Sequence, residues 1–209
     1  MINKDENQNR KRNTKEVIME VAIGLFSEDG VSAVSIRDIA KKVGINQSSL
    51  YNHYKSKDEL LETIFEKFKQ ELGMASFQEE GMEEQIEITG PELFLQNHLL
   101  RLRERITPDI QKIWKIIYIE QFRDKRARDI VLKDILGTPA VFYEKAFKIM
   151  MEKDMIKAVD PKILSDEYNY ALFAFSLERM LLQTDDKDVM PAVRKMLEHI
   201  KFICNAIKK

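Results

Sequence analysis

The stretch IRDIAKKVGINQSSLYNHY, from Ile36 to Tyr54, constrains the fold more than any other part of the chain. The small residue Ala40 is followed four positions later by Gly44, and six positions after that by the apolar Leu50. This spacing suits two helices joined by a sharp turn, because a small side chain lets the helices approach, glycine permits the turn and an apolar anchor packs back. A plain helical hairpin does not require this spacing, so we predict a helix-turn-helix. The remaining core positions are filled by Ile39, Val43 and Ile45.

The second helix of this motif, expected from Asn46 or Gln47 to about Tyr54, presents short hydrogen-bonding residues and an aromatic outward. These suit base edges and phosphates in a DNA major groove, whereas a merely solvated face would favour Glu and Lys. The amide of Gln47 can pair bidentately with adenine. Lys57 and the start of the next helix are expected to hold phosphate through positive charge and free backbone N–H groups. The outward-facing residues are Gln47, Ser48, Ser49, Tyr51, Asn52 and His53, of which His53 suits a phosphate, a helix cap or a base equally.

Helical periodicity surrounds this motif. An apolar stripe predicts a helix over residues 15–29, with Thr14 as its N-cap. Ser35 opens the next helix with a sequence close to a capping box, and that helix is expected to end near Val43. A second capping box precedes a helix over residues 57–72.

The rest of the chain also predicts helices. Residues 73–90 lose the periodicity and gather acidic residues, which indicates a mobile connection. Three pairs put a capping residue before a proline, as expected at helix starts: Thr107-Pro108, Thr138-Pro139 and Asp160-Pro161. Without strand alternation, the fold class is all-α. The expected helices span about 91–105, 108–123, 124–135, 138–153, 161–183 and 187–207.

Composition limits the function classes. The chain has 209 residues, of which 44% are hydrophobic and 33% charged, a balance typical of a globular protein. With no secretory signal and no transmembrane stretch, we expect a cytoplasmic protein. Phosphate-binding loops and G-x-S-x-G or H-E-x-x-H motifs are absent, and the three histidines lie far apart. We therefore expect no catalytic residues, no metal site and no cofactor.

Residues 15–60 resemble the DNA-binding domain of the TetR family. The resemblance is carried by the amphipathic helix ending LFSEDG, by SIRDIAKKVG and by SSLYNHYKSKDELL. It implies that Ser35 and Arg37 approach phosphates or the groove edge, and that positions 47–49 and 52 face bases or backbone. Ser48-Ser49 departs from the family, where glycine or lysine with threonine is frequent, which bears on base specificity. The resemblance also implies a DNA-facing side lined by Tyr51, His53, Tyr54 and Lys57.

The loss of periodicity after residue 72 places a domain boundary there, and the resemblance implies an effector pocket and a dimer interface beyond it. We therefore expect three parts: a DNA-binding domain over 1–57 with a basic arm over 1–14, a connecting helix over 58–72, and an effector-binding and dimerisation domain over 73–209. The arm carries a local charge of +3 over residues 4–15, and a solvated tail or a DNA contact explains it equally well.

The effector pocket is expected where large apolar residues and embedded polar groups occur in helices that are apolar on most sides. We expect a small, largely apolar effector, and ordinary core packing remains the alternative for each residue. The candidate lining residues are His98, Trp114, Tyr118, Gln121, Phe122, Phe142, Phe147, Met150, Asn169 and Phe173.

Members of the family pair through their last two long helices. We favour 161–183 with 187–207 over 138–153 with 161–183, because the former end the chain and carry apolar stripes. The sequence thus predicts a repressor that binds a palindromic operator as a homodimer and is released by a small effector. A DNA-binding regulator without an effector, or an activator, is the alternative.

Overall fold

The structure is a computed structural model that describes residues 4–72 and 77–209, with side chains from Thr14 onward. Within these ranges the chain forms helices and no β-strand, which confirms the all-α fold class. A π-helix, Ile130–Gly137, leads directly into α8. The other helices are α1 (Lys4–Asp29), α2 (Ile36–Val43), α3 (Gln47–Tyr51), α4 (Lys57–Leu72), α5 (Met82–Arg105), α6 (Pro108–Glu120), α7 (Lys125–Asp129), α8 (Thr138–Glu152), α9 (Pro161–Thr184) and α10 (Met190–Ile207).

Packing divides the chain into two compact units. Met1–Gln70 and Thr107–Asp129 form the N-terminal unit, whereas Glu71–Ile106 and Ile130–Lys209 form the C-terminal unit. The segment 107–129 joins the N-terminal unit because α6 packs against α1 and its Trp114 meets Phe68 of α4 edge-on, with ring centroids 5.9 Å apart. This grouping differs from the division expected at residue 73, since an apolar helix does not reveal which neighbours bury it.

α1 supplies much of the core of the N-terminal unit. It begins at Lys4 rather than at residue 15, so Thr14 lies inside the helix and is not its N-cap. Ile18, Ala22 and Phe26 recur on one face and are fully buried. The side chains up to residue 13 lie outside the described part of the chain, so the basic arm stays a prediction.

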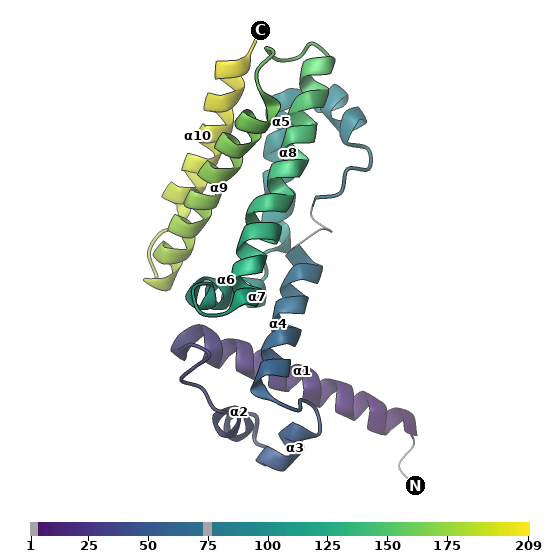
Figure 1. Cartoon of the computed structure of the whole chain (residues 1–209), viewed down its shortest axis with the longest axis vertical. Helices are drawn as coiled ribbons and strands as arrows, with labels where there is room; N and C mark the ends of the chain where they lie inside the picture. The colour runs from purple at the N-terminus through teal and green to yellow at the C-terminus, as the bar shows by residue number, and fades with distance from the viewer. Residues whose placement is uncertain (1–3, 73–76) are drawn as a thin grey trace. The chain divides into compact units, whose positions relative to one another are not determined.

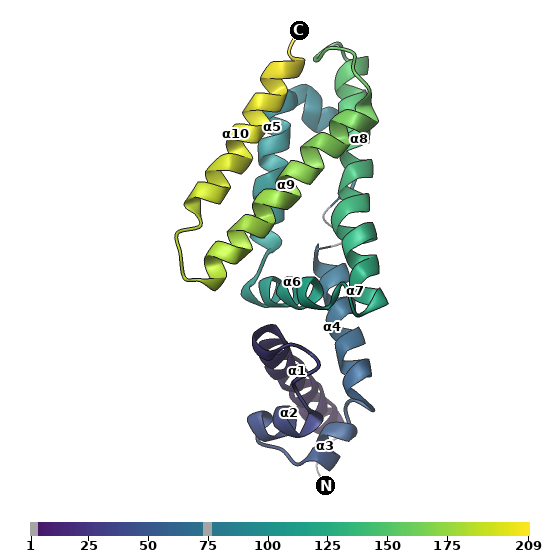
Figure 2. The ribbon, with the colours of Figure 1, turned by 60° about the vertical axis from the view of Figure 1, so that its left-hand side comes forward.

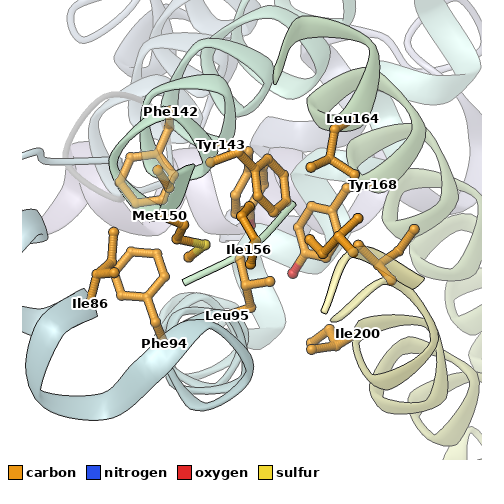
Figure 3. Packing of buried hydrophobic residues seen from close by; sticks show 14 of the residues in the cluster. Ile86, Phe94, Leu95, Phe142, Tyr143, Met150, Ile156, Leu164, Tyr168 and Ile200 are labelled. Carbon is orange, nitrogen blue, oxygen red and sulfur yellow. The ribbon is translucent and has the colours of Figure 1, made fainter. Parts of the chain in front are cut away.

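In the C-terminal unit, α9 packs against α8 and α10, and α5 packs against the same two helices. Figures 1 and 2 show α9 and α10 side by side and running in opposite directions. Side chains from all four helices meet in one apolar cluster (Figure 3). Its members include Phe94 and Leu95 of α5, Phe142 and Tyr143 of α8, Tyr168 of α9 and Ile200 of α10.

Two predicted segments of this unit have different boundaries. α5 begins at Met82, inside the segment 73–90 expected as a mobile connection, and residues 73–76 of that segment lie outside the described ranges. Its helical path is interrupted at Gly90, whose φ of 75° is in the left-handed region, just before Pro91. The expected helix 124–135 is instead the short α7 followed by the π-helix.

The predicted caps are confirmed at two of the three prolines. The Thr107 side chain accepts from the Ile110 N–H, and the Asp160 side chain accepts from the Ile163 N–H. The cap predicted at Thr138 is wrong, because α8 continues from the π-helix and the Thr138 hydroxyl donates to the Lys133 carbonyl instead. No helix in the described residues has both the length and the apolar character needed to cross a membrane.

Candidate nucleic-acid interface and ligand cavity

The helix-turn-helix forms as its spacing predicts. Ala40 and Leu50 are both buried, at 2% and 0% exposure, so the anchor on α3 sits in the core beside α2. Gly44 ends α2 with φ of 80°, a left-handed conformation that favours glycine. The backbone N–H of Ile45 then donates to the Ala40 carbonyl at 3.0 Å, which closes the turn. α2 starts with a capping box, in which Ser35 and Asp38 exchange side-chain to backbone hydrogen bonds.

α3 is shorter than predicted and ends at Tyr51. Asn46 caps it by accepting from the Ser49 N–H at 2.7 Å, and the Ser48 hydroxyl donates to the same Asn46 oxygen at 2.7 Å. Gln47 and Tyr51 lie one turn apart on the exposed side, with the Gln47 amide 3.5 Å from the Tyr51 hydroxyl. The short helix thus presents an amide and a phenol to solvent.

Two residues expected on the DNA-facing side have partners within the fold. The Tyr54 ring is buried, and its hydroxyl donates to the Lys15 carbonyl at 3.3 Å, so its place on the DNA-facing side is corrected. Burial, with Glu59 and Glu16 nearby, raises the pKa of Tyr54 to about 12. The half-buried Lys57 donates to the carbonyls of Val31 at 2.7 Å and Val34 at 2.9 Å, which fastens the connection between α1 and α2.

The remaining candidates keep polar groups near the surface. Ser35 is exposed and occupied by its capping box, where hydrogen bonds from Ser35 hold the pKa of Asp38 below its usual value. Ser49 and His53 are half-buried. The exposed candidates are Arg37, Gln47, Ser48, Tyr51 and Asn52. Together they offer a guanidinium, two amides and hydroxyls, which are groups that hydrogen-bond phosphate oxygens and base edges.

The C-terminal unit contains a partly open cavity of about 400 Å³, which is bordered by residues just before and at the start of α5, by the end of α5 and by α8. Charged and amide side chains dominate its lining, so it is more polar than the pocket expected from the sequence. The lining residues are Gln78, Glu80, Met82, Gln85, Phe94, His98, Arg101, Leu102, Glu104, Arg105 and Phe142.

His98 is the buried polar group of this cavity. Its side chain is 3% exposed, and its Nε2 atom has no hydrogen-bond partner among the described residues. The imidazole stacks on Phe142, with ring centroids 4.4 Å apart. Burial lowers the pKa of His98 to about 4, and the nearby positive charge of Arg101 adds to the effect. At neutral pH the ring is therefore uncharged.

Of the ten residues predicted to line a pocket, only His98 and Phe142 border this cavity. Phe147 and Met150 are fully buried in the apolar cluster, Phe173 is half-buried on α9, and Asn169 donates to the Leu136 carbonyl of the π-helix at 3.0 Å.

The other four candidates lie on or just after α6, in the N-terminal unit. Trp114 packs on Phe68, and Tyr118 lies beside Trp114, with ring centroids 6.2 Å apart. The Gln121 amide donates to the Tyr118 carbonyl at 2.9 Å, and Phe122 is 85% exposed. None of the four borders the cavity.

Sequence reasoning missed the cavity's arginines and glutamines. Arg101 and Arg105 follow His98 at three and seven positions, a spacing that puts all three on one face of a helix. This helical spacing was the sequence signal that could have identified the two arginines as lining residues. Gln78 and Gln85 come from the segment that was expected to be a mobile connection.

Comparison with known proteins places the N-terminal residues in a family. A family model described as bacterial regulatory proteins, tetR family, matches residues 18–64, which hold the helix-turn-helix. The HTH-type transcriptional regulator AcrR of Shigella flexneri is 38% identical over 60 residues, which cover 29% of this chain and 28% of AcrR. The HTH-type transcriptional regulator YerO of Bacillus subtilis, itself described as uncharacterized, is 26% identical over 185 residues, which cover 79% of this chain and 63% of YerO. The match therefore spans less than two thirds of either relative.

Solved structures show the same fold over nearly the whole chain. A protein described as a TetR-family transcriptional regulator from Mesorhizobium loti has a TM-score of 0.64 at 17% identity, covering 96% of this chain and 99% of that one. SmeT, described as the repressor of a multidrug efflux pump of Stenotrophomonas maltophilia, has a TM-score of 0.61 at 18% identity, covering 93% and 90%. Residues 18–64 thus match the DNA-binding domain of the TetR family of transcriptional regulators, and the chain shares the fold of proteins described as members of that family.

Proposed function

We propose that this protein is a transcriptional repressor that binds a palindromic operator as a homodimer and is released by a small effector. The observation that carries the proposal is the helix-turn-helix, whose α3 is anchored by the buried Leu50 while Gln47 and Tyr51 face solvent. Such a helix enters the major groove with its N-terminal residues toward the bases. Such a regulator acts in the cytoplasm, and we propose no catalytic role for it.

The homodimer is supported by an exposed apolar stripe on α9. Ile163, Tyr170 and Leu181 are 62%, 55% and 62% exposed, and their spacing of seven and eleven residues keeps them on one helix face. α10 lies beside α9 and adds the exposed Phe202. A two-fold pairing through α9 and α10 buries this stripe against its own copy, because the same patch serves both subunits.

Repression by steric occupancy is the simplest action for a dimer that covers DNA, and SmeT, which shares the fold, is described as a repressor. We place effector binding and dimerisation in the C-terminal unit, where the cavity beside His98 lies. An effector releases DNA only if it binds the non-DNA-binding state more tightly, and a 100-fold preference corresponds to about 2.7 kcal/mol of coupling.

A regulator without an effector is the second candidate, and the packing of the C-terminal unit favours it. Phe147 and Met150, two residues expected to line a pocket, are fully buried in the apolar cluster. A protein with so filled a core could act through its abundance or a protein partner. The cavity beside His98 is the observation against this reading.

Selection from random duplexes tests DNA binding and finds the operator sequence in one experiment. The full chain is incubated with a pool of random-sequence duplexes, and the retained DNA is sequenced. We expect two-fold-symmetric sites with half-sites about 34–36 Å apart, or a multiple of that spacing. Enrichment of an asymmetric single site, or of no sequence at all, would contradict the proposal.

Gln47→Ala should change which sequences are selected. Loss of an amide that pairs with one base costs about 1–3 kcal/mol at that base pair and relaxes the preference there. The matched control is Gln70→Ala, which removes an exposed amide from α4 and should leave the selected motif unchanged. An unchanged motif for Gln47→Ala would remove Gln47 from the reading surface.

A further inference from the structure

We propose that the cavity beside His98 binds an organic anion with a flat apolar body, whose charged group is held by Arg101 and Arg105 and whose body lies against Phe142. The inference rests on the proposed function, because it names the class of effector. The class differs from the largely apolar effector expected from the sequence, since the ligand carries a negative charge.

The first support is the arrangement of cations on α5. His98, Arg101 and Arg105 all line the cavity, and their spacing of three and four residues puts them on one face of the helix. Phe94 continues the same face one turn earlier, so the stripe runs from apolar to basic along the cavity. A guanidinium presents paired N–H donors that match the two oxygens of a carboxylate or sulfonate.

The two arginines are free to bind an anion. Within the described ranges neither Arg101 nor Arg105 forms an ion pair, whereas Lys153 of the same unit pairs with Glu83 and Glu87. Two carboxylates, Glu80 and Glu104, also line the cavity. After burial, the positive charge of Arg101 is the second cause that lowers the pKa of His98, which places a cation near the buried end of the cavity.

The second support is His98 itself. Its side chain is buried, borders the cavity and has an Nε2 atom without a partner among the described residues. A neutral imidazole has one donor and one acceptor nitrogen, so a ligand hydroxyl, amine or carbonyl could bond to Nε2. A ligand that bonds to a buried polar atom without a partner gains more free energy than one that bonds to an exposed atom, which water already solvates.

The apolar wall sets the shape of the ligand body. The Phe142 ring stacks on His98 and lies nearly parallel to Phe94, at an interplanar angle of 15° (Figure 3 shows Phe94 and Phe142). Flat rings pack well against such a wall. The volume of about 400 Å³ lies within the range of small-molecule sites, about 300–1,000 Å³.

Two fluorescent probes that differ in one charged group test the proposal. 8-Anilinonaphthalene-1-sulfonate is a flat apolar amine with a sulfonate, and N-phenyl-1-naphthylamine is the same molecule without it. Each is titrated into the full chain without DNA. We expect the sulfonate to bind at one site per chain, about ten-fold or more tightly than the neutral amine.

Variants locate that site. Arg101→Gln/Arg105→Gln should weaken binding of the sulfonate about ten-fold or more and change binding of the neutral amine by less than about two-fold. Arg103→Gln is the matched control, because Arg103 is exposed on the same helix but does not line the cavity. His98→Leu should weaken both probes, since it removes the hydrogen-bonding group. Circular dichroism and the melting temperature confirm that each variant is folded.

Three outcomes would overturn the proposal: no saturable binding of the sulfonate, equal affinity for the two probes, or an equal effect of the double variant and Arg103→Gln. The DNA selection described above uses the wild-type chain without probe. Its failure would overturn the proposed function, whereas failure of the probe titration with successful DNA selection would overturn only the class of effector.

Discussion

Lys57 and His98 are polar side chains that differ in whether the fold gives them hydrogen-bond partners. The ammonium of Lys57 donates to two backbone carbonyls, at Val31 and Val34. The Nε2 atom of His98 has no such partner in the part of the chain that the structure describes. A buried group without a partner costs about 1–3 kcal/mol. Lys57 therefore stabilises the N-terminal unit, while His98 lowers the stability of the C-terminal unit unless a ligand supplies a partner.

His98 should make the protein less stable in mild acid. The pKa of His98 is about 4 in the folded chain and about 6.5 in an unfolded one, so the unfolded state takes up its proton first as pH falls. Above about pH 6.5 neither state is protonated at His98, so this residue causes little loss of stability. The free energy of unfolding falls as the pH is lowered from 6.5 to 4. At pH 5 the loss is roughly 1–2 kcal/mol. Urea unfolding at pH 7 and pH 5 measures it.

The variant His98→Gln isolates this contribution. It lacks the titrating group, so its stability should fall less than that of the wild type over the same pH range. His199, whose pKa is also lowered by burial, is present in both proteins and cancels in the difference. Parallel pH profiles for the two proteins would show that His98 is not held neutral by the fold.

Lys57→Ala should weaken the N-terminal unit before any effect on DNA is considered. The change leaves the carbonyls of the buried Val31 and Val34 without their charged donor, and such hydrogen bonds contribute about 1.5–3 kcal/mol in all. Urea unfolding of the variant should show a loss of that order. Lys55→Ala removes an exposed lysine two residues away and should change stability by less than about 0.5 kcal/mol. Equal stabilities of the two variants would show that the hydrogen bonds of Lys57 do not stabilise the unit.

At the scale of elements, Arg126 joins α7 to α4 within the N-terminal unit. Its guanidinium contacts Asp58 at 2.7 Å and Glu62 at 3.0 Å on α4, and Asp124 at 2.6 Å. The same group lies over the Phe65 ring, 5.8 Å from its centroid. Three carboxylates and an aromatic face around one arginine form a network, which contributes more than an isolated surface ion pair.

Arg126→Ala should therefore lower the free energy of unfolding by about 1–2 kcal/mol, through lost ion pairs and lost packing on Phe65. Lys125→Ala is the control. Lys125 pairs with Asp129 one turn along the helix, and its side chain is 79% exposed, so the loss should stay below about 0.5 kcal/mol. Chemical denaturation measures the free energy of unfolding of both variants. Equal losses would mean that the network around Arg126 does not stabilise the unit.

Local signals determined which elements were predictable. The turn at Gly44 and the caps at Ser35, Thr107 and Asp160 depend on residues a few positions apart, and the sequence predicted each of them. The predicted cap at Thr138 was wrong because a π-helix, whose Leu136 carbonyl accepts from Asn169 of distant α9, runs into α8. The lining of the cavity was not predicted for a similar reason. The packing of α5 on α8 decides which apolar residues are buried in the core and which line the cavity.

At the scale of the whole molecule, the chain passes between the two units three times, after residues 70, 106 and 129. The first passage lies in the last turn of α4, which matches the expected connecting helix over residues 58–72. The other two flank α6 and α7, which pack with the DNA-binding helices. Under the proposed function, an effector in the C-terminal unit therefore has three connections through which to act on the N-terminal unit. Operator DNA must then weaken effector binding by the same factor by which the effector weakens DNA binding.

The central claim is that two copies of this chain read one two-fold DNA site. The most direct measurement is the number of chains bound per duplex, by sedimentation, together with the affinity for a full selected site and for a single half-site at the same salt concentration. The account predicts two chains per full site and at least about 100-fold weaker binding to the half-site, because one helix-turn-helix presents little surface. One chain per duplex, with equal affinity for the full site and the half-site, would contradict it.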